Sequence, residues 1–132
     1  MSTSISQTQL FTEMTAEEGA TLSGGTAQVY LKHFVIYDTQ EWPRDEPYLK
    51  VDGSTIWSKD GAGNGIHAID KAFNITGTYD TLSLWENDSW PNNDEFLGEN
   101  KIYSWQRGTD LELSFTGEGA NYKLVYDVYD VY

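Results

Sequence analysis

The feature that most constrains this chain is a series of short apolar segments separated by clusters of turn-forming residues. From residue 27 onward, segments rich in β-branched and aromatic residues alternate with Gly, Asp, Asn and Pro. Short segments at this spacing are typical of the strands of a β-sandwich or small barrel, and none has a helical period. We predict eight antiparallel strands, at residues 27–37, 47–51, 54–58, 67–76, 81–86, 100–105, 110–115 and 121–131.

Two local patterns support an all-β fold. Asp52-Gly53 lies between two predicted strands and is typical of a type I′ hairpin turn, in which both central residues need a positive φ. In the last segment apolar and polar residues alternate, which predicts one buried and one exposed face. The buried face would present Tyr122, Leu124, Tyr126 and Val128, and the other face Lys123 and Asp127.

The charge of the chain restricts its partners. Its 21 acidic and 8 basic residues give a net charge of −13, and it has no cysteine. Nucleic acid is excluded as a favoured partner because phosphate binding needs a basic face, and direct attraction to an anionic membrane is disfavoured for the same reason. A surplus of carboxylates suits a hard divalent cation. The alternative is that the charge only keeps the protein soluble.

The first 25 residues differ from the rest, since they contain no Trp or Tyr and no alternating pattern. Phe11, Met14, Glu18 and Leu22 would share one face of a short helix, which Gly24-Gly25 would end. This segment resembles the double-glycine leaders of exported bacterial peptides such as bacteriocins, which a peptidase-containing ABC exporter cuts after the second glycine. The resemblance implies a leader at 1–25, a mature domain at 26–132, and a secreted or cell-surface location. The alternative is a polar tail that ends in a Gly-Gly hinge.

Two predicted loops hold the acidic residues that suggest a site. The first loop follows the strand at 27–37 and contains Asp38, Asp45 and Glu46. The second, at residues 84–98, begins in the last residues of the strand at 81–86 and contains Glu86, Asp88, Asp94 and Glu95. A Ca²⁺ ion takes 6–8 oxygen ligands, so two converging acidic loops could bind one. The alternative is a set of solvated carboxylates with no ligand.

The same loops resemble those of the C2 domain family. The stretch Glu46-Pro-Tyr-Leu-Lys-Val51 is similar to the family's Asp-Pro-Tyr-(Leu/Val)-Lys-Val, and Glu86-x-Asp88-x5-Asp94 is similar to its second acidic motif. The distance from Asp94 to Gly98 is one residue longer than in the family. The resemblance implies a C2-like β-sandwich that binds calcium. Its implied ligands are Asp38, Asp45, Glu46, Glu86, Asp88, Asp94 and Glu95.

The aromatic residues suggest how such a module would act. Trp42 and Trp90 each precede a Pro inside an acidic loop, where they could contact a membrane surface, stack on a glycan, or cap their own loop. Trp57, Trp85 and Trp105 fall in predicted strands, which favours positions in the core or at the sandwich edge.

No motif of an enzyme is present. His33 and His67 lie in predicted strands among apolar residues, and no nucleophile elbow, zinc-protease pair or phosphate loop occurs. We expect an exported calcium-binding module without catalytic residues. The alternatives are a bacteriocin-like or structural secreted protein without metal binding, and a small hydrolase.

Overall fold

The computed structural model describes residues 26–88 and 93–131. The predicted leader, with Gly24 and Gly25, and Trp90 in the second loop lie outside the described residues. The strands are β2 (Thr26–Asp38), β3 (Pro47–Val51), β4 (Ser54–Ser58), β5 (Gly65–Asn74), β6 (Tyr79–Glu86), β7 (Glu95–Tyr103), β8 (Gly108–Phe115) and β9 (Asn121–Val131). A 3₁₀ turn, η1 (Gly117–Gly119), joins β8 to β9.

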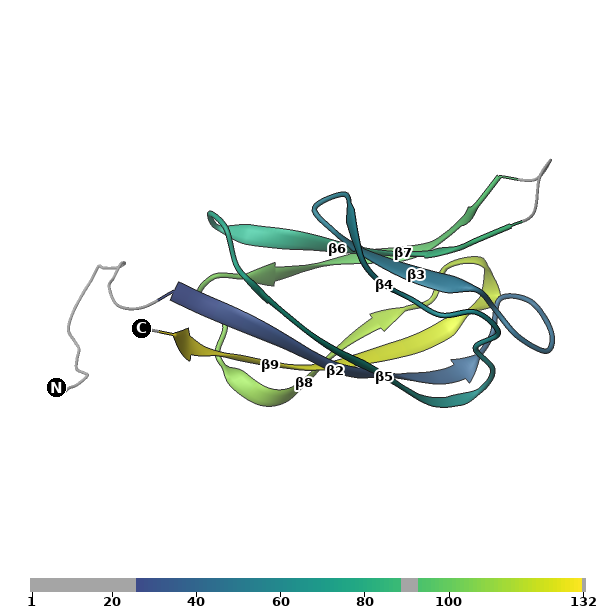
Figure 1. Cartoon of the computed structure of the whole chain (residues 1–132), viewed down its shortest axis with the longest axis horizontal. Helices are drawn as coiled ribbons and strands as arrows, with labels where there is room; N and C mark the ends of the chain where they lie inside the picture. The colour runs from purple at the N-terminus through teal and green to yellow at the C-terminus, as the bar shows by residue number, and fades with distance from the viewer. Residues whose placement is uncertain (1–25, 89–92, 132) are drawn as a thin grey trace, which may run out of the picture. The chain divides into compact units, whose positions relative to one another are not determined.

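These strands form two four-stranded sheets, with the orders β5-β2-β9-β8 and β4-β3-β6-β7. Figure 1 shows the sheets as two layers. The pairs β3–β4, β3–β6, β6–β7 and β8–β9 are antiparallel. The prediction of an eight-stranded antiparallel β-sandwich is confirmed.

The chain forms two compact units, of which the larger is Val29–Val128. The smaller includes Gln28 and Tyr129, and in it the Tyr129 hydroxyl donates a hydrogen bond to Gln28 Oε1 at 2.6 Å. The boundary predicted between residues 25 and 26 falls where the described residues begin, so it stays a prediction. No helix among the described residues has the length and apolarity needed to cross a membrane.

Aromatic packing holds the core of the larger unit together. The Phe34 ring of β2 lies 5.3 Å from Trp57 of β4, 6.0 Å from Phe115 of β8 and 5.5 Å from Tyr122 of β9, centroid to centroid. The contacts join strands of both sheets. The predicted alternation in β9 is confirmed, since the four residues of its predicted inner face are all buried. Burial of Trp57 also agrees with the sequence.

The strand predicted at residues 100–105 differs most from the structure, while the bounds of β2, β5, β6 and β8 differ by one or two residues. β7 begins at Glu95 instead of residue 100, because its main-chain pairing with β6 continues as far as Glu86 and Glu95. The register shifts by one residue near Leu84, which accommodates an additional residue in β7. Trp105 lies in a turn beyond β7 and is 71% exposed, so its prediction as a strand residue was wrong.

The hairpin turn after β3 and the pairing of β3 with β6 place the two acidic loops at one end of the larger unit. Asp52 and Gly53 have φ values of 49° and 87°, as the predicted hairpin turn requires. β3 then pairs with β6 so that Pro47 lies opposite Glu86. The loop before β3 and the loop after β6 therefore meet side by side, and Figure 1 shows both at the end where η1 also lies.

Candidate metal site between two acidic loops

The first loop is folded around the buried side chain of Asp45. Its carboxylate accepts hydrogen bonds from the Gln40 amide at 2.7 Å, the Glu41 amide at 2.8 Å and the Tyr122 hydroxyl at 2.7 Å. Burial, followed by this contact with Asp45, raises the pKa of Tyr122 above its ordinary value, so the phenol stays a donor. The main chain of Asp45 also exchanges two hydrogen bonds with Ala62, at 2.8 and 2.9 Å. These contacts fix the course of the loop.

The second loop is tied to the first through its backbone. The Glu46 amide donates to Glu86 Oε2 at 3.0 Å, and the Asn87 amide donates to the Glu46 carbonyl at 2.9 Å. Asp94 then closes the second loop, because its Oδ1 accepts from the Asp88 amide at 3.1 Å and its Oδ2 from the Tyr48 hydroxyl. The loops are thus held together by main-chain hydrogen bonds and by one oxygen of Glu86, whose other oxygen, Oε1, has no hydrogen-bond partner.

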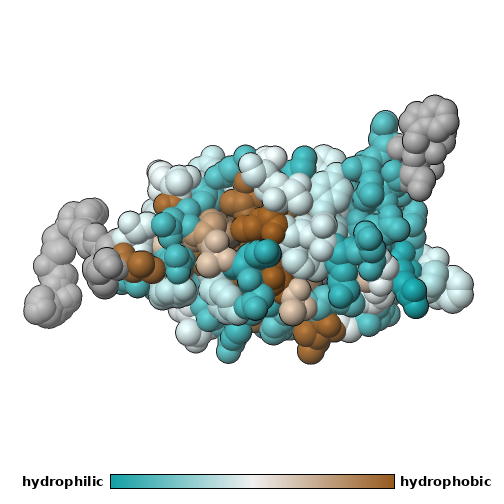
Figure 2. Space-filling model, in the orientation of Figure 1, coloured by the Kyte–Doolittle hydropathy of each residue, from teal (hydrophilic) through white to brown (hydrophobic). Residues whose placement is uncertain are grey.

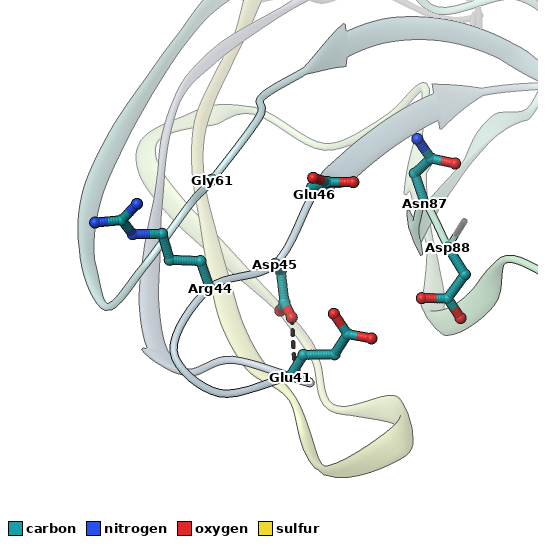
Figure 3. Close-up of a pocket in the computed structure, with 7 residues that line it drawn as sticks. All are labelled: Glu41, Arg44, Asp45, Glu46, Gly61, Asn87 and Asp88. Atoms are coloured by element: carbon teal, nitrogen blue, oxygen red, sulfur yellow. Dashed lines mark hydrogen bonds between the residues drawn. The ribbon is translucent and has the colours of Figure 1, made fainter.

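Three carboxylates from the two loops converge. Oxygen atoms of Glu41, Glu86 and Asp88 all lie within 4.8 Å of one another. Glu41 and Asp88 also line an open cavity of about 420 Å³, together with Arg44, Asp45, Glu46, Gly61 and Asn87. Figure 3 shows Glu41 and Asp88 directed toward each other, while Arg44 extends away from them toward Gly61. Arg44 is the one basic residue in this lining, and its side chain is directed away from the two carboxylates.

Glu86 is the electrostatic centre of this cluster. Only 1% of its surface is exposed, and its Oε1 is buried without a hydrogen-bond partner. Burial, followed by the close approach of the Asp88 carboxyl group, raises the pKa of Glu86 from 4.5 to about 8. Burial and the neighbouring Asp88 also raise the pKa of Glu41. Carboxylates held this close repel one another unless a proton or a cation lies between them.

The structure separates the predicted ligands into three groups. Glu86 and Asp88 belong to the three-carboxylate cluster, and Glu46 lines the adjoining cavity. Asp45 and Asp94 have oxygens engaged in the loop contacts described above. Glu95 pairs with Glu86 across the β6–β7 ladder and has a buried, unpartnered Oε1, whereas Asp38 ends β2 in an exposed position and does not line the cavity. The ligand set as a whole stays a prediction.

Glu41 joins the cluster although the sequence did not predict it as a ligand. The only signal was its place in an acidic loop, and its direction depends on how Asp45 folds that loop. Next to it, Trp42 is 92% exposed and contributes nothing to the core. Figure 2 shows hydrophilic residues gathered at the end of the larger unit where the two acidic loops lie.

No protein-family model and no curated protein matches this chain. Solved structures do. A protein described as a C2 domain is 15% identical, with a TM-score of 0.51 over 81% of this chain and 99% of that one. A structure of two C2 domains of Extended-Synaptotagmin 2 is also 15% identical, with a TM-score of 0.55 over 92% of this chain and 46% of that one.

A third structure, of CC2D1B, is 10% identical, with a TM-score of 0.52 over 83% of this chain and 56% of that one. The chain therefore spans about half the length of two of these three proteins. The chain has a C2-like fold. At these identities the likeness concerns the C2-like fold alone, so the function must be argued from the site.

Proposed function

We propose that this C2-like domain binds Ca²⁺ between its two acidic loops, with Glu41, Glu86 and Asp88 as the central ligands. The observation that supports this most strongly is the buried, unpartnered Oε1 of Glu86 beside two further carboxylates. A buried carboxylate oxygen without a donor is costly, and a bound cation removes that cost. Glu46 and Asn87 line the same cavity and could complete the ligand set with oxygen atoms.

The ligand chemistry favours Ca²⁺ over other ions. The cluster offers only oxygen atoms, and the chain has no cysteine to favour a softer metal. An open cavity formed by loops suits the 6–8 ligands and variable geometry of Ca²⁺ better than the compact octahedron of Mg²⁺. Bound Ca²⁺ would replace the proton that the raised pKa of Glu86 retains at neutral pH.

The exposed tryptophan beside this cluster suggests a target. Trp42 projects from the first acidic loop, one residue after Glu41. Bound Ca²⁺ would cancel part of the negative charge that opposes approach to an anionic lipid surface, and tryptophan is favoured at membrane interfaces. We therefore propose that calcium-loaded loops place Trp42 at a lipid headgroup region. Stacking of Trp42 on a glycan is the alternative target at this loop.

Export is proposed on the sequence of residues 1–25 alone, with a peptidase-containing ABC exporter as the partner. We propose in addition that the domain acts by binding and has no catalytic activity. The mass of the protein recovered outside cells that co-express such an exporter tests the leader. A product that begins at Thr26 supports cleavage after Gly25, and the full-length chain contradicts it.

Calorimetric titration of the full chain with Ca²⁺ and with Mg²⁺ tests the metal site. We expect saturable Ca²⁺ binding that Mg²⁺ does not match, and at least tenfold weaker binding after Glu41→Gln or Asp88→Asn. The matched control is Glu112→Gln, because Glu112 lies on β8 and pairs with Lys123, outside the cluster. Absence of Ca²⁺ binding would favour the alternative of an exported structural or antagonistic protein.

A further inference from the structure

Aromatic side chains lie at both ends of the outer face of β6 and β7 in the sheet β4-β3-β6-β7. Along β6 and β7 the inward residues Leu82, Leu84 and Ile102 are fully buried, so the alternate residues face outward. The outward set is rich in rings. We define the aromatic strip as Tyr79, Tyr103 and Trp105 at one end and Trp85 and Phe96 at the other.

The first end of the strip has the geometry of a stacking platform. The rings of Tyr79 and Tyr103 lie 5.5 Å apart, centroid to centroid. The rings of Tyr103 and Trp105 lie 5.7 Å apart and only 27° from parallel. Tyr79 is 42% exposed and Trp105 is 71% exposed, so both keep much of their surface available to a ligand.

Backbone hydrogen bonds hold Trp105 in place without burying its ring. The Ser104 amide donates to the Thr78 carbonyl at 2.8 Å, and the Gln106 amide donates to the Tyr103 carbonyl at 3.1 Å. The Gln106 side chain in turn accepts from the Tyr103 amide at 2.7 Å. A fixed turn that exposes an indole reduces the entropy cost of binding, which favours a binding role over a packing role.

The strip is long and is interrupted by polar groups. Tyr79 and Trp85 are six positions apart on β6, which corresponds to about 20 Å along a strand. Phe96 extends the far end, with its ring 5.0 Å from that of Trp85. Between the two ends, Thr81 and Ser83 face outward with their hydroxyl groups. Rings separated by hydrogen-bonding groups suit a chain of pyranose rings, which combines apolar C–H faces with hydroxyl edges.

The charges near the aromatic strip indicate which class of polymer could bind there. Lys101 lies 4.5 Å from the Tyr79 ring and Lys50 lies 5.5 Å from the Trp85 ring, while Glu99 is the acidic residue that faces outward on β7. Two ammonium groups on the strip disfavour a polycation. The net charge of −13 disfavours a polyanion such as nucleic acid. An uncharged partner meets neither penalty.

We propose that the aromatic strip binds a neutral polysaccharide, with pyranose rings stacked on Trp105, Tyr103 and Tyr79. The strip lies on the sheet face and its first end is remote from the acidic loops, so it acts without Ca²⁺. Lys101 and Lys50 donate hydrogen bonds to sugar hydroxyls at its rim. This site is independent of the proposed calcium function, and each can fail without the other.

Native gel electrophoresis of the full chain through soluble neutral polysaccharides tests this proposal. The gels contain a β-glucan, a xylan or a galactomannan, and a matching gel contains the anionic polymer alginate. We expect retardation by at least one neutral polymer, unchanged by a calcium chelator, and at least a tenfold loss of affinity in Trp105→Ala. Ile66→Ala is the matched control, since it removes another apolar side chain that is 71% exposed, on β5 of the other sheet.

Several results would overturn the proposal. These are no retardation by any of the neutral polymers, retardation by alginate alone, or equal retardation of Trp105→Ala and the unmodified protein. Loss of lipid-vesicle binding in Trp105→Ala without polysaccharide retention would assign the strip to a membrane instead. Because the Trp105 ring is exposed, the variant should unfold at the same temperature as the unmodified protein, and this measurement excludes misfolding.

Discussion

Replacing Glu86 with Gln should stabilise the domain when calcium is absent. The pKa of the buried Glu86 carboxyl rises from 4.5 to about 8 on folding, so the folded state binds this proton more tightly than the unfolded state does. The corresponding stabilisation is complete below pH 4.5 and is lost as the pH rises toward 8. Gln has nearly the same shape, carries no charge, and can still accept from the Glu46 amide while its NH₂ group faces Asp88.

The size of the effect follows from the pH. At pH 7 the solution lies about 2.5 pH units above the ordinary pKa of a Glu, and each unit corresponds to about 1.4 kcal/mol, so the variant should gain about 3 kcal/mol. At pH 5 the unmodified protein retains most of the proton, and the gain should fall to about 1 kcal/mol. A gain of about 3 kcal/mol corresponds to an increase in melting temperature of roughly 10 °C.

Urea unfolding in excess chelator at pH 5 and pH 7 measures both values. Glu99→Gln is the control, because Glu99 is exposed on the outer face of β7. We expect the Glu86→Gln variant to be more stable than the unmodified protein at pH 7, and the difference to shrink at pH 5. A variant that is less stable at both pH values, or a difference that does not change with pH, would refute the electrostatic argument.

Three further predictions concern the loops and their supports. Tyr122→Phe removes a donor from the buried carboxylate of Asp45 and should lower the free energy of unfolding by about 1–3 kcal/mol in urea; no change would show that this hydrogen bond is not needed. Gly117→Ala should destabilise by about 1–3 kcal/mol because its Cβ would lie 2.8 Å from the backbone of β7, whereas Gly63→Ala, with 3.6 Å of space, should cost less in the same assay. Trp42→Ala should abolish calcium-dependent sedimentation with anionic vesicles and leave calcium affinity unchanged; retained sedimentation would exclude Trp42 as the membrane contact.

Local pattern was sufficient to predict the strands and part of the site. The bounds of β3, β4 and β9 agree with the alternation of apolar residues and with the turn residues between them. The proximity of Glu86 and Asp88 follows from their spacing at the end of a strand, where i and i+2 side chains share a face. These features depend on residues that are close in the sequence, so they can be predicted without knowledge of the fold.

Features that depend on distant contacts could not be predicted in the same way. Glu41 reaches the cluster because Asp45 folds the first loop, and Asp45 is held by Tyr122, which lies 77 positions away in the chain. β7 begins early because pairing with β6 outweighs the loop-like composition of its first residues. Trp105 is exposed because β7 ends before it, at Tyr103.

The melting temperature of the full chain in excess chelator, in Ca²⁺ and in Mg²⁺ tests the calcium proposal most directly. At a Ca²⁺ concentration about 100 times its dissociation constant, binding to the folded state should add about 2.7 kcal/mol, which corresponds to a rise of roughly 10 °C. We expect Mg²⁺ to produce a smaller rise, and the double variant Glu41→Gln with Asp88→Asn to show no calcium response. An equal melting temperature with chelator and with millimolar Ca²⁺, in a folded protein, would contradict the calcium proposal.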